Sequence, residues 1–188
     1  MLSDKSNSAV HWYLPAQSRS FRSVNKTGTT STGVKLPLCA RFHFGVIFMY
    51  ILKAKAAFDS AHFLSGYEGK CSNLHGHRWK IEAEIFGEQL VQEGQLRGMV
   101  VDFGDLKKDL KALADEFDHA FIYEKNSLKE STVTALNDEN FRLLEVGFRP
   151  TAENFAKYFY DRLAETGYSV KTITVYETPD NCASYTKE

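Results

Sequence analysis

Residues 74–86 read LHGHRWKIEAEIF and alternate between apolar and polar side chains after the two histidines. Successive side chains of a strand point to opposite faces, so a period of two predicts a half-buried β-strand. Trp79 and the aliphatic positions share one parity, and His75 and His77 share it with them. Both imidazoles are therefore expected on the covered face of a sheet, away from water.

A second alternating stretch lies upstream. Residues 51–62 read ILKAKAAFDSAH, in which Ala54 and Phe58 share one parity and two lysines take the other. We predict a strand here as well, with His62 on its apolar face. Residues 64–73 between the two stretches are rich in Gly, Ser and Asn, which is typical of a loop. The two strands are therefore expected to form a hairpin.

The rest of the chain predicts two helices and further strands. Apolar residues recur at helical spacing in 106–117 and in 155–163. The helix boundaries, strands and loop that we expect are an N-cap at Asp102 or Asp105, a helix end near Asp118-His119, an N-cap at Thr151, strands at 99–103, 141–146 and 170–178, and a loop over 120–140. This order indicates an α+β domain, an antiparallel sheet with two helices packed on one face.

Composition excludes several classes of protein. The 188 residues carry a net charge of −1, which excludes a broadly basic nucleic-acid binder. The longest apolar run, residues 42–52, is broken by His43 and is too short for a membrane span. Three cysteines cannot all pair with one another, so we expect a reducing compartment, the cytoplasm, and not a disulfide scaffold.

Residues 1–48 differ in composition from residues 49–188. They hold six Lys or Arg and one acid, a charge of +5, whereas the remainder carries −6. They are rich in Ser and Thr and show no amphipathic period, so we expect a disordered extension before a domain at 49–188. A transit peptide, a functional tail and a start codon placed too far upstream all remain open. Met49, directly before the first predicted strand, favours the last as the natural initiator.

His75-Gly76-His77 is the sharpest chemical signal. Side chains two apart on a strand project to one face, about 6.5–7 Å apart at the backbone, so two imidazoles there can bind one ion. His62 on a neighbouring strand would complete a set of three histidines with an open fourth position, the arrangement of a catalytic zinc site. The alternative is three ordinary histidines with hydrogen-bond partners.

Two further features lie near helix or loop ends. Cys71, four residues before His75, is open to three interpretations: a fourth metal ligand, a general base beside the ion, or an inert thiol. Asp118-His119 is either a helix-end feature or a pair that moves a proton.

Glu177 has the core-facing parity of the last predicted strand. A buried carboxylate needs a partner, which is either a structural arginine or a ligand with two parallel N–H donors. The segment from Thr151 to Glu153 is either a helix N-cap or a site for an anion or a carbonyl.

Six motifs in order resemble the 6-pyruvoyl-tetrahydropterin synthase superfamily. They are Phe58-Asp59-Ser60-Ala61-His62, Cys71-x3-His75-Gly76-His77, Val100-Val101-Asp102-Phe103, Asp118-His119, Pro150-Thr151-Ala152-Glu153-Asn154 and Val175-Tyr176-Glu177-Thr178. Together they extend over nearly all of residues 49–188. The gap of three residues between Cys71 and His75 is similar to the bacterial branch that makes 6-carboxy-5,6,7,8-tetrahydropterin in queuosine (7-deazaguanine) biosynthesis.

The resemblance implies the tunnelling fold (T-fold), in which sheets of several subunits join into a barrel, with active sites between subunits of a homohexamer. It implies that His62, His75 and His77 bind Zn²⁺, that Cys71 takes a proton from the substrate, and that His119, oriented by Asp118, relays one. Glu177 would bind the pterin ring, with Thr151 and Glu153 bordering its pocket.

The substrate implied is 7,8-dihydroneopterin triphosphate. The products would be 6-carboxytetrahydropterin, acetaldehyde and triphosphate. Lys70, Arg78 and Arg149 are candidates to hold the triphosphate. Two alternatives stay open: triphosphate elimination alone, giving 6-pyruvoyl-tetrahydropterin, and a non-catalytic pterin- or metal-binding relative.

Overall fold

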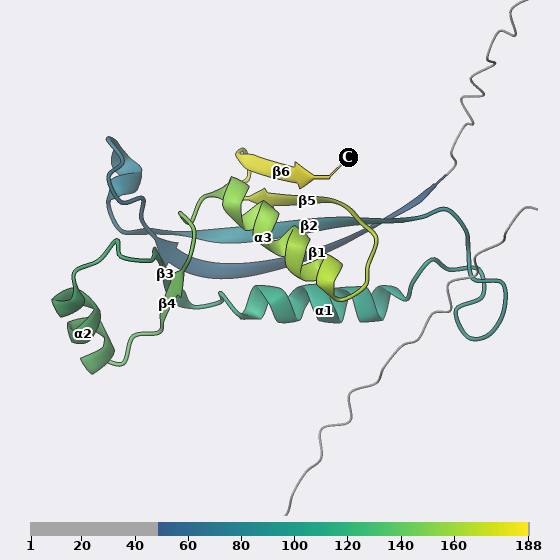
Figure 1. The fold of residues 1–188 in the computed structure, drawn as a ribbon, viewed down its shortest axis with the longest axis horizontal. Coiled ribbons are helices and arrows are strands. Elements are labelled where there is room, and N and C mark those ends of the chain that lie inside the picture. Colours follow the sequence, from purple (N-terminus) through teal and green to yellow (C-terminus); the bar gives the residue numbers. More distant parts are fainter. Residues whose placement is uncertain (1–48, 188) are drawn as a thin grey trace, which may run out of the picture. The chain divides into compact units, whose positions relative to one another are not determined.

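The computed structural model describes residues 49–187, and the predictions made for residues 1–48 lie outside them. The described residues form a six-stranded sheet with the strand order β4-β3-β1-β2-β5-β6 (Figure 1). In chain order the elements are β1 (Tyr50–His62), the short 3-10 helix η1 (Lys70–Ser72), β2 (His75–Gly87), α1 (Phe103–Asp115), β3 (Ala120–Glu124), α2 (Glu130–Asp138), β4 (Leu143–Val146), α3 (Ala152–Glu165), β5 (Val170–Tyr176) and β6 (Cys182–Thr186).

The predicted hairpin is confirmed. β1 and β2 pair antiparallel along their whole lengths, with Phe58 opposite Trp79 and His62 opposite His75. Residues directly opposite in an antiparallel pair project to the same face. The register therefore brings the three histidines of the two strands to one end of one face.

The sheet is mixed, where an antiparallel sheet was expected. β3 pairs parallel with the end of β1, and β4 pairs parallel with β3. On the other side, β5 and β6 continue the antiparallel pattern from β2. The α+β class stands, and β3 runs beside the histidine end of β1.

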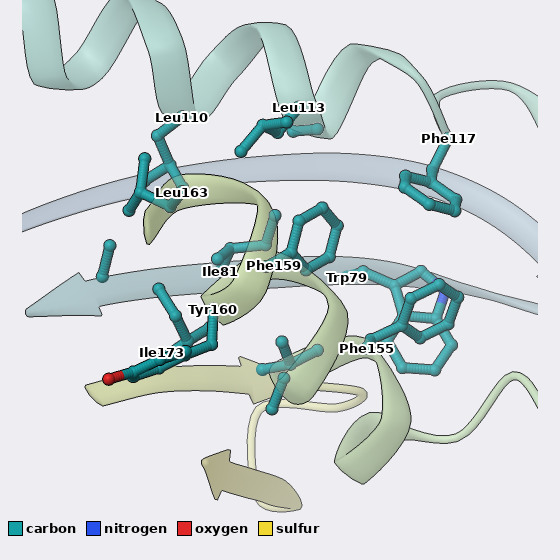
Figure 2. Close-up of a cluster of buried hydrophobic side chains, with 14 of the residues drawn as sticks. Trp79, Ile81, Leu110, Leu113, Phe117, Phe155, Phe159, Tyr160, Leu163 and Ile173 are labelled. Atoms are coloured by element: carbon teal, nitrogen blue, oxygen red, sulfur yellow. The ribbon is translucent and has the colours of Figure 1, made fainter. Parts of the chain in front are cut away.

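Helices α1 and α3 cover one face of the sheet and enclose the core (Figure 2). Both begin at the predicted caps, with Asp102 accepting from the Gly104 amide and Thr151 accepting from the Asn154 amide. The largest fully buried side chains include Trp79 and Phe155, whose ring centroids lie 4.9 Å apart in an edge-on contact. Burying an aromatic side chain contributes roughly 1.5–3 kcal/mol. This aromatic packing fixes the wall behind the histidines.

Several predicted boundaries are wrong. Residues 99–103 form no strand, because β2 ends at Gly87 and Val100 packs on that glycine beyond the end of the ladder, while Phe103 already begins α1. That helix ends at Asp115, before the predicted Asp118-His119, although Phe117 is buried as its spacing indicated.

The predicted loop over 120–140 contains two elements, β3 and the helix α2. The helix buries none of its nine residues and lies away from α1 and α3, beyond the β4 edge in Figure 1. β6 is a further strand that the sequence patterns did not indicate. Within residues 49–187, no helix has the length and apolar character that crossing a bilayer requires.

Candidate active site

Three imidazoles converge where β1 ends and β2 begins. One ring nitrogen from each of His62, His75 and His77 lies within 4.8 Å of the other two. The ring centroids of His62 and His75 are 4.4 Å apart, and His62 is fully buried. The strand parity thus produces the cluster that it predicted.

Backbone carbonyls fix which nitrogen of two rings is free. The carbonyl of Pro150 lies 2.8 Å from His62 Nδ1, and the carbonyl of Asn73 lies 2.8 Å from His75 Nδ1. A carbonyl only accepts, so each Nδ1 carries the proton and each Nε2 presents a lone pair. The Nε2 atoms of all three histidines are buried and have no hydrogen-bond partner within the described residues.

Burial favours the neutral form of two of the imidazoles, those of His62 and His77. It lowers the pKa of His62 from 6.5 to about 4, and the neighbouring imidazoles add to this effect. Burial also lowers the pKa of His77, although the carboxylate of Glu177 opposes the change. Three unpartnered ring nitrogens facing one point fit a divalent ion such as Zn²⁺, which takes imidazole nitrogen at about 2.0–2.1 Å.

Glu177 reaches the same place from the turn that directly follows β5, because that strand ends at Tyr176 and not at the predicted 178. Its Oε1 lies 3.7 Å from His62 Nε2 and 3.7 Å from His77 Nε2. Its amide donates to the Asn181 carbonyl at 3.0 Å, in the turn between β5 and β6. The side chain is partly exposed, so the carboxylate borders the histidine cluster and still faces solvent-accessible space.

A cavity of about 260 Å³ adjoins Glu177. It brings together four of the predicted site residues, Cys71, Thr151, Glu153 and Glu177. Cys71 lies in η1 and is half-buried. Within residues 49–187 it forms no disulfide bond, and its sulfur does not belong to the group of converging ligand atoms. Of its three interpretations, this placement disfavours a fourth ligand and leaves a general base and an inert thiol open.

Arg149 ties the Cys71 loop to the corner before α3. Its Nη2 donates to the Ser65 carbonyl at 2.8 Å, and its guanidinium lies over the ring of Tyr67. Its own carbonyl accepts from the Asn154 side-chain amide at 2.9 Å. The next residue, Pro150, supplies the carbonyl that orients His62. One side chain therefore connects the segment that carries the thiol with the segment that orients a candidate ligand.

Asp118 and His119 lie apart from this cavity. His119 Nδ1 is 2.8 Å from Asp118 Oδ2, and the other carboxylate oxygen accepts from the Asp59 amide at 2.8 Å. This backbone hydrogen bond, with the one to His119, holds the pKa of Asp118 below its usual value. His119 is largely exposed and lines a hollow of about 640 Å³ whose other lining residues include Asp59, Ala61 and the candidate ligand His77.

Two partner groups escaped the sequence patterns. The carbonyls of Asn73 and Pro150 orient His75 and His62, but a backbone acceptor leaves no mark in residue type. Pro150 carried an indirect signal, since it directly precedes the predicted N-cap of α3. Beside the cluster, the buried Ser60 Oγ and Trp79 Nε1 also have no hydrogen-bond partner in the described part of the chain.

Comparison with known proteins agrees with this geometry. The sequence profile of the 6-pyruvoyl tetrahydropterin synthase family matches residues 51–188. A Haemophilus influenzae protein named 6-carboxy-5,6,7,8-tetrahydropterin synthase is 40% identical over 140 residues, covering 73% of this chain and 99% of that protein. An Aquifex aeolicus protein of the same name is 36% identical over 129 residues, covering 63% of this chain and 77% of the relative.

Solved structures share the fold. A 6-pyruvoyl tetrahydropterin synthase from Plasmodium vivax matches with a TM-score of 0.57 at 21% identity, covering 74% of this chain and 98% of the other. One from Caenorhabditis elegans matches with a TM-score of 0.53 at 23% identity, covering 76% and 98%. The fold, the site and the sequence relatives define an enzyme of the pterin synthase class. The chain belongs to the 6-pyruvoyl tetrahydropterin synthase family.

Proposed function

We propose that the protein is a zinc-dependent lyase of queuosine biosynthesis. It would convert 7,8-dihydroneopterin triphosphate and water to 6-carboxy-5,6,7,8-tetrahydropterin, acetaldehyde and triphosphate. The observation that carries the proposal is the set of three buried, unpartnered Nε2 atoms beside a cavity that holds a thiol and a carboxylate. Relatives with 36–40% identity bear the name of this activity.

His62, His75 and His77 would hold the zinc ion. When bound, the ion supplies a Lewis acid that stabilises negative charge on side-chain oxygens of the substrate. The chain prepares these ligands in advance, because two carbonyls fix the tautomers of His62 and His75, and burial disfavours protonation of His62 and His77. The wall of Trp79 behind His62 and His77, with centroids 5.0 and 5.5 Å away, restricts ring rotation.

Glu177 would bind the pterin ring of the substrate, and Cys71 would act on its side chain. The Glu177 carboxylate accepts two parallel N–H bonds from the guanidine-like edge of the pterin, with Thr151 and Glu153 bordering the ring. Cys71, as thiolate, removes a proton from the substrate side chain. This role requires a reduced thiol, which agrees with a cytoplasmic location.

The Asp118-His119 pair would complete the site from another subunit. Within one chain, His119 does not line the cavity of Cys71 and Glu177. Its hydrogen bond to Asp118 orients the ring and leaves Nε2 to exchange a proton with a substrate held by a neighbouring copy. The proposal therefore includes a homohexamer with active sites between subunits.

A product assay tests the function. The zinc-loaded full chain is incubated with 7,8-dihydroneopterin triphosphate, and the products are identified by mass spectrometry. A 6-carboxy product with acetaldehyde supports the proposal. A 6-pyruvoyl product without acetaldehyde would assign triphosphate elimination alone, and no turnover by a zinc-replete assembly would leave a non-catalytic pterin or metal binder.

Cys71→Ala separates the roles of the thiol. We expect the variant to retain one zinc ion per chain and to lose turnover. Loss of zinc would instead make Cys71 a ligand. Cys182→Ala serves as the control because it removes the other free thiol within residues 49–187, which lines the same cavity.

A further inference from the structure

A groove of about 580 Å³ runs along the face of the sheet that α1 and α3 leave uncovered. Its walls come from three neighbouring strands and include Ala57 of β1, Arg78 and Lys80 of β2, and Tyr176 of β5. Glu177 lines this groove and also the 260 Å³ cavity of Cys71. The two spaces therefore meet at one carboxylate, beside the histidine cluster.

The two spaces differ in charge. The cavity of Cys71 is lined by the carboxylates of Glu153 and Glu177 and by no lysine or arginine of the described residues. The groove is lined by two cations, Arg78 and Lys80, with Glu177 as its one carboxylate among residues 49–187. A polyphosphate is repelled by the first lining and attracted by the second.

Lys80 is available to bind an anion. Its Nζ lies 4.7 Å from the centre of the Tyr176 ring, and it forms no ion pair with a carboxylate of the part of the chain described. On the same face, Lys53 and Lys55 are paired with Glu82 and Glu84. An ammonium held over an aromatic ring keeps its charge and its three donors.

Arg78 supplies a second cation. Its Nη1 forms an ion pair with Asp59 Oδ2 at 2.8 Å, which steadies the guanidinium and leaves its further N–H donors free. Gly76, which lines the same groove, has no side chain to fill the space between Arg78 and the histidines. Arg149, by contrast, is occupied with Ser65 and Tyr67, and Lys70 lines neither space.

We propose that this groove is the polyphosphate subsite of the enzyme, with Lys80 and Arg78 as its cations. The identity of the substrate rests on the proposed function. A pterin ring bound at Glu177 in the Cys71 cavity has its three-carbon side chain beside the histidines, and the triphosphate continues into the groove. The substrate thus extends from an acidic pocket to a basic one.

Calorimetric titration with inorganic triphosphate tests the subsite without turnover. The zinc-loaded full chain is compared with Lys80→Gln, Arg78→Gln and the matched control Lys55→Gln, which removes a lysine of the same face outside the groove. We expect Kd to rise at least about tenfold in each groove variant and less than about twofold in the control. The EDTA-treated chain, titrated in parallel, removes chelation of the ion as a source of heat.

A second probe separates the subsite from the rest of the site. Binding of 7,8-dihydroneopterin, which lacks phosphate, should be unchanged in both groove variants. Wild-type affinity for inorganic triphosphate in Lys80→Gln and Arg78→Gln, or an equal loss for both probes, would overturn the subsite even if the enzyme turns over. A chain that binds triphosphate through Lys80 and Arg78 but makes no pterin product would retain the subsite and overturn the proposed function.

Discussion

The inward face of the β1–β2 hairpin has an aliphatic half and a polar half. Away from the histidines, Ala54, Ala83 and Ile85 are buried in the hydrophobic core. Toward the end, Ser60 and the histidines are enclosed by the same ladder but keep polar atoms without partners. Backbone pairing assigns alternate side chains to one face whatever their chemistry. The same alternation therefore positions both the core residues and the histidines.

The difference has an energetic consequence. A buried polar group without a partner costs about 1–3 kcal/mol, and five such side-chain atoms lie on Ser60, Trp79 and the three histidines. The polar half is therefore stable only because the aliphatic half and the aromatic wall hold it closed. Trp79 stands at the border, edge-on to both His62 and Phe155.

Removing a candidate metal ligand from the polar half should have the largest effect of the four changes, and the quantity affected should be the catalytic rate. In His75→Ala we expect zinc content to fall from one per chain to near zero, and turnover to fall at least about 1,000-fold, or about 4 kcal/mol of activation free energy. Metal analysis and initial rates measure this. His119→Ala is the matched control and should keep its zinc, so loss of zinc there would contradict the assignment of the ligands.

A large truncation in the aromatic wall should act on stability. Phe155→Ala removes a ring with no exposed surface and should lower the free energy of unfolding by about 3–5 kcal/mol. Urea unfolding at fixed protein concentration measures it. Phe141→Ala removes a ring that is 60% exposed and should cost less than about 0.5 kcal/mol. Equal costs for the two variants would be inconsistent with a core centred on Phe155.

Acid should weaken the metal-free fold through the polar half. Unfolded His62 takes up a proton near pH 6.5, whereas folded His62 resists protonation until about pH 4, because burial disfavours the cation. Stability is therefore fully present above pH 6.5 and is lost as the pH falls toward 4, by on the order of 3 kcal/mol. Urea midpoints of the EDTA-treated chain between pH 7.5 and 4.5 measure the loss. His62→Gln should flatten the profile, and an unchanged slope would exclude His62 as its source.

The smallest effect is expected at Arg149, which connects the Cys71 loop with the segment before α3. Arg149→Met removes the hydrogen bond to Ser65 and the contact with Tyr67. We expect kcat to fall about tenfold, or about 1.4 kcal/mol, with zinc content unchanged, because the Cys71 loop loses its fixed position. Steady-state kinetics measure it against Arg97→Met, an exposed arginine in the loop after β2. Equal kcat values in the two variants would show that Arg149 does not position the thiol.

The sequence patterns predicted those strands and helices whose apolar residues recur with a strict period. The alternation in β1 and β2 placed His62, His75 and His77 on one face, because each strand buries one parity. The two capped helices followed from their apolar stripes in the same way.

Elements without such a stripe were missed. α2 buries no residue, so it has no apolar period to detect, and β6 is a five-residue edge strand that buries no side chain fully. β3 is short, and its parallel pairing with β1 joins residues far apart in the sequence, which a local apolar period cannot reveal. For the same reason, sequence spacing could not show that His119 lies outside the cavity of Cys71.

The three candidate ligands all come from one hairpin, with fifteen positions separating His62 from His77. Closing so short a loop costs little chain entropy, and hairpins form in about 1–10 μs. The carbonyl that orients His62 belongs to Pro150, 88 positions away, and arrives only when α3 docks. We therefore expect the three histidines to meet early in folding and His62 to be oriented late, so that its orientation would report the docking of α3.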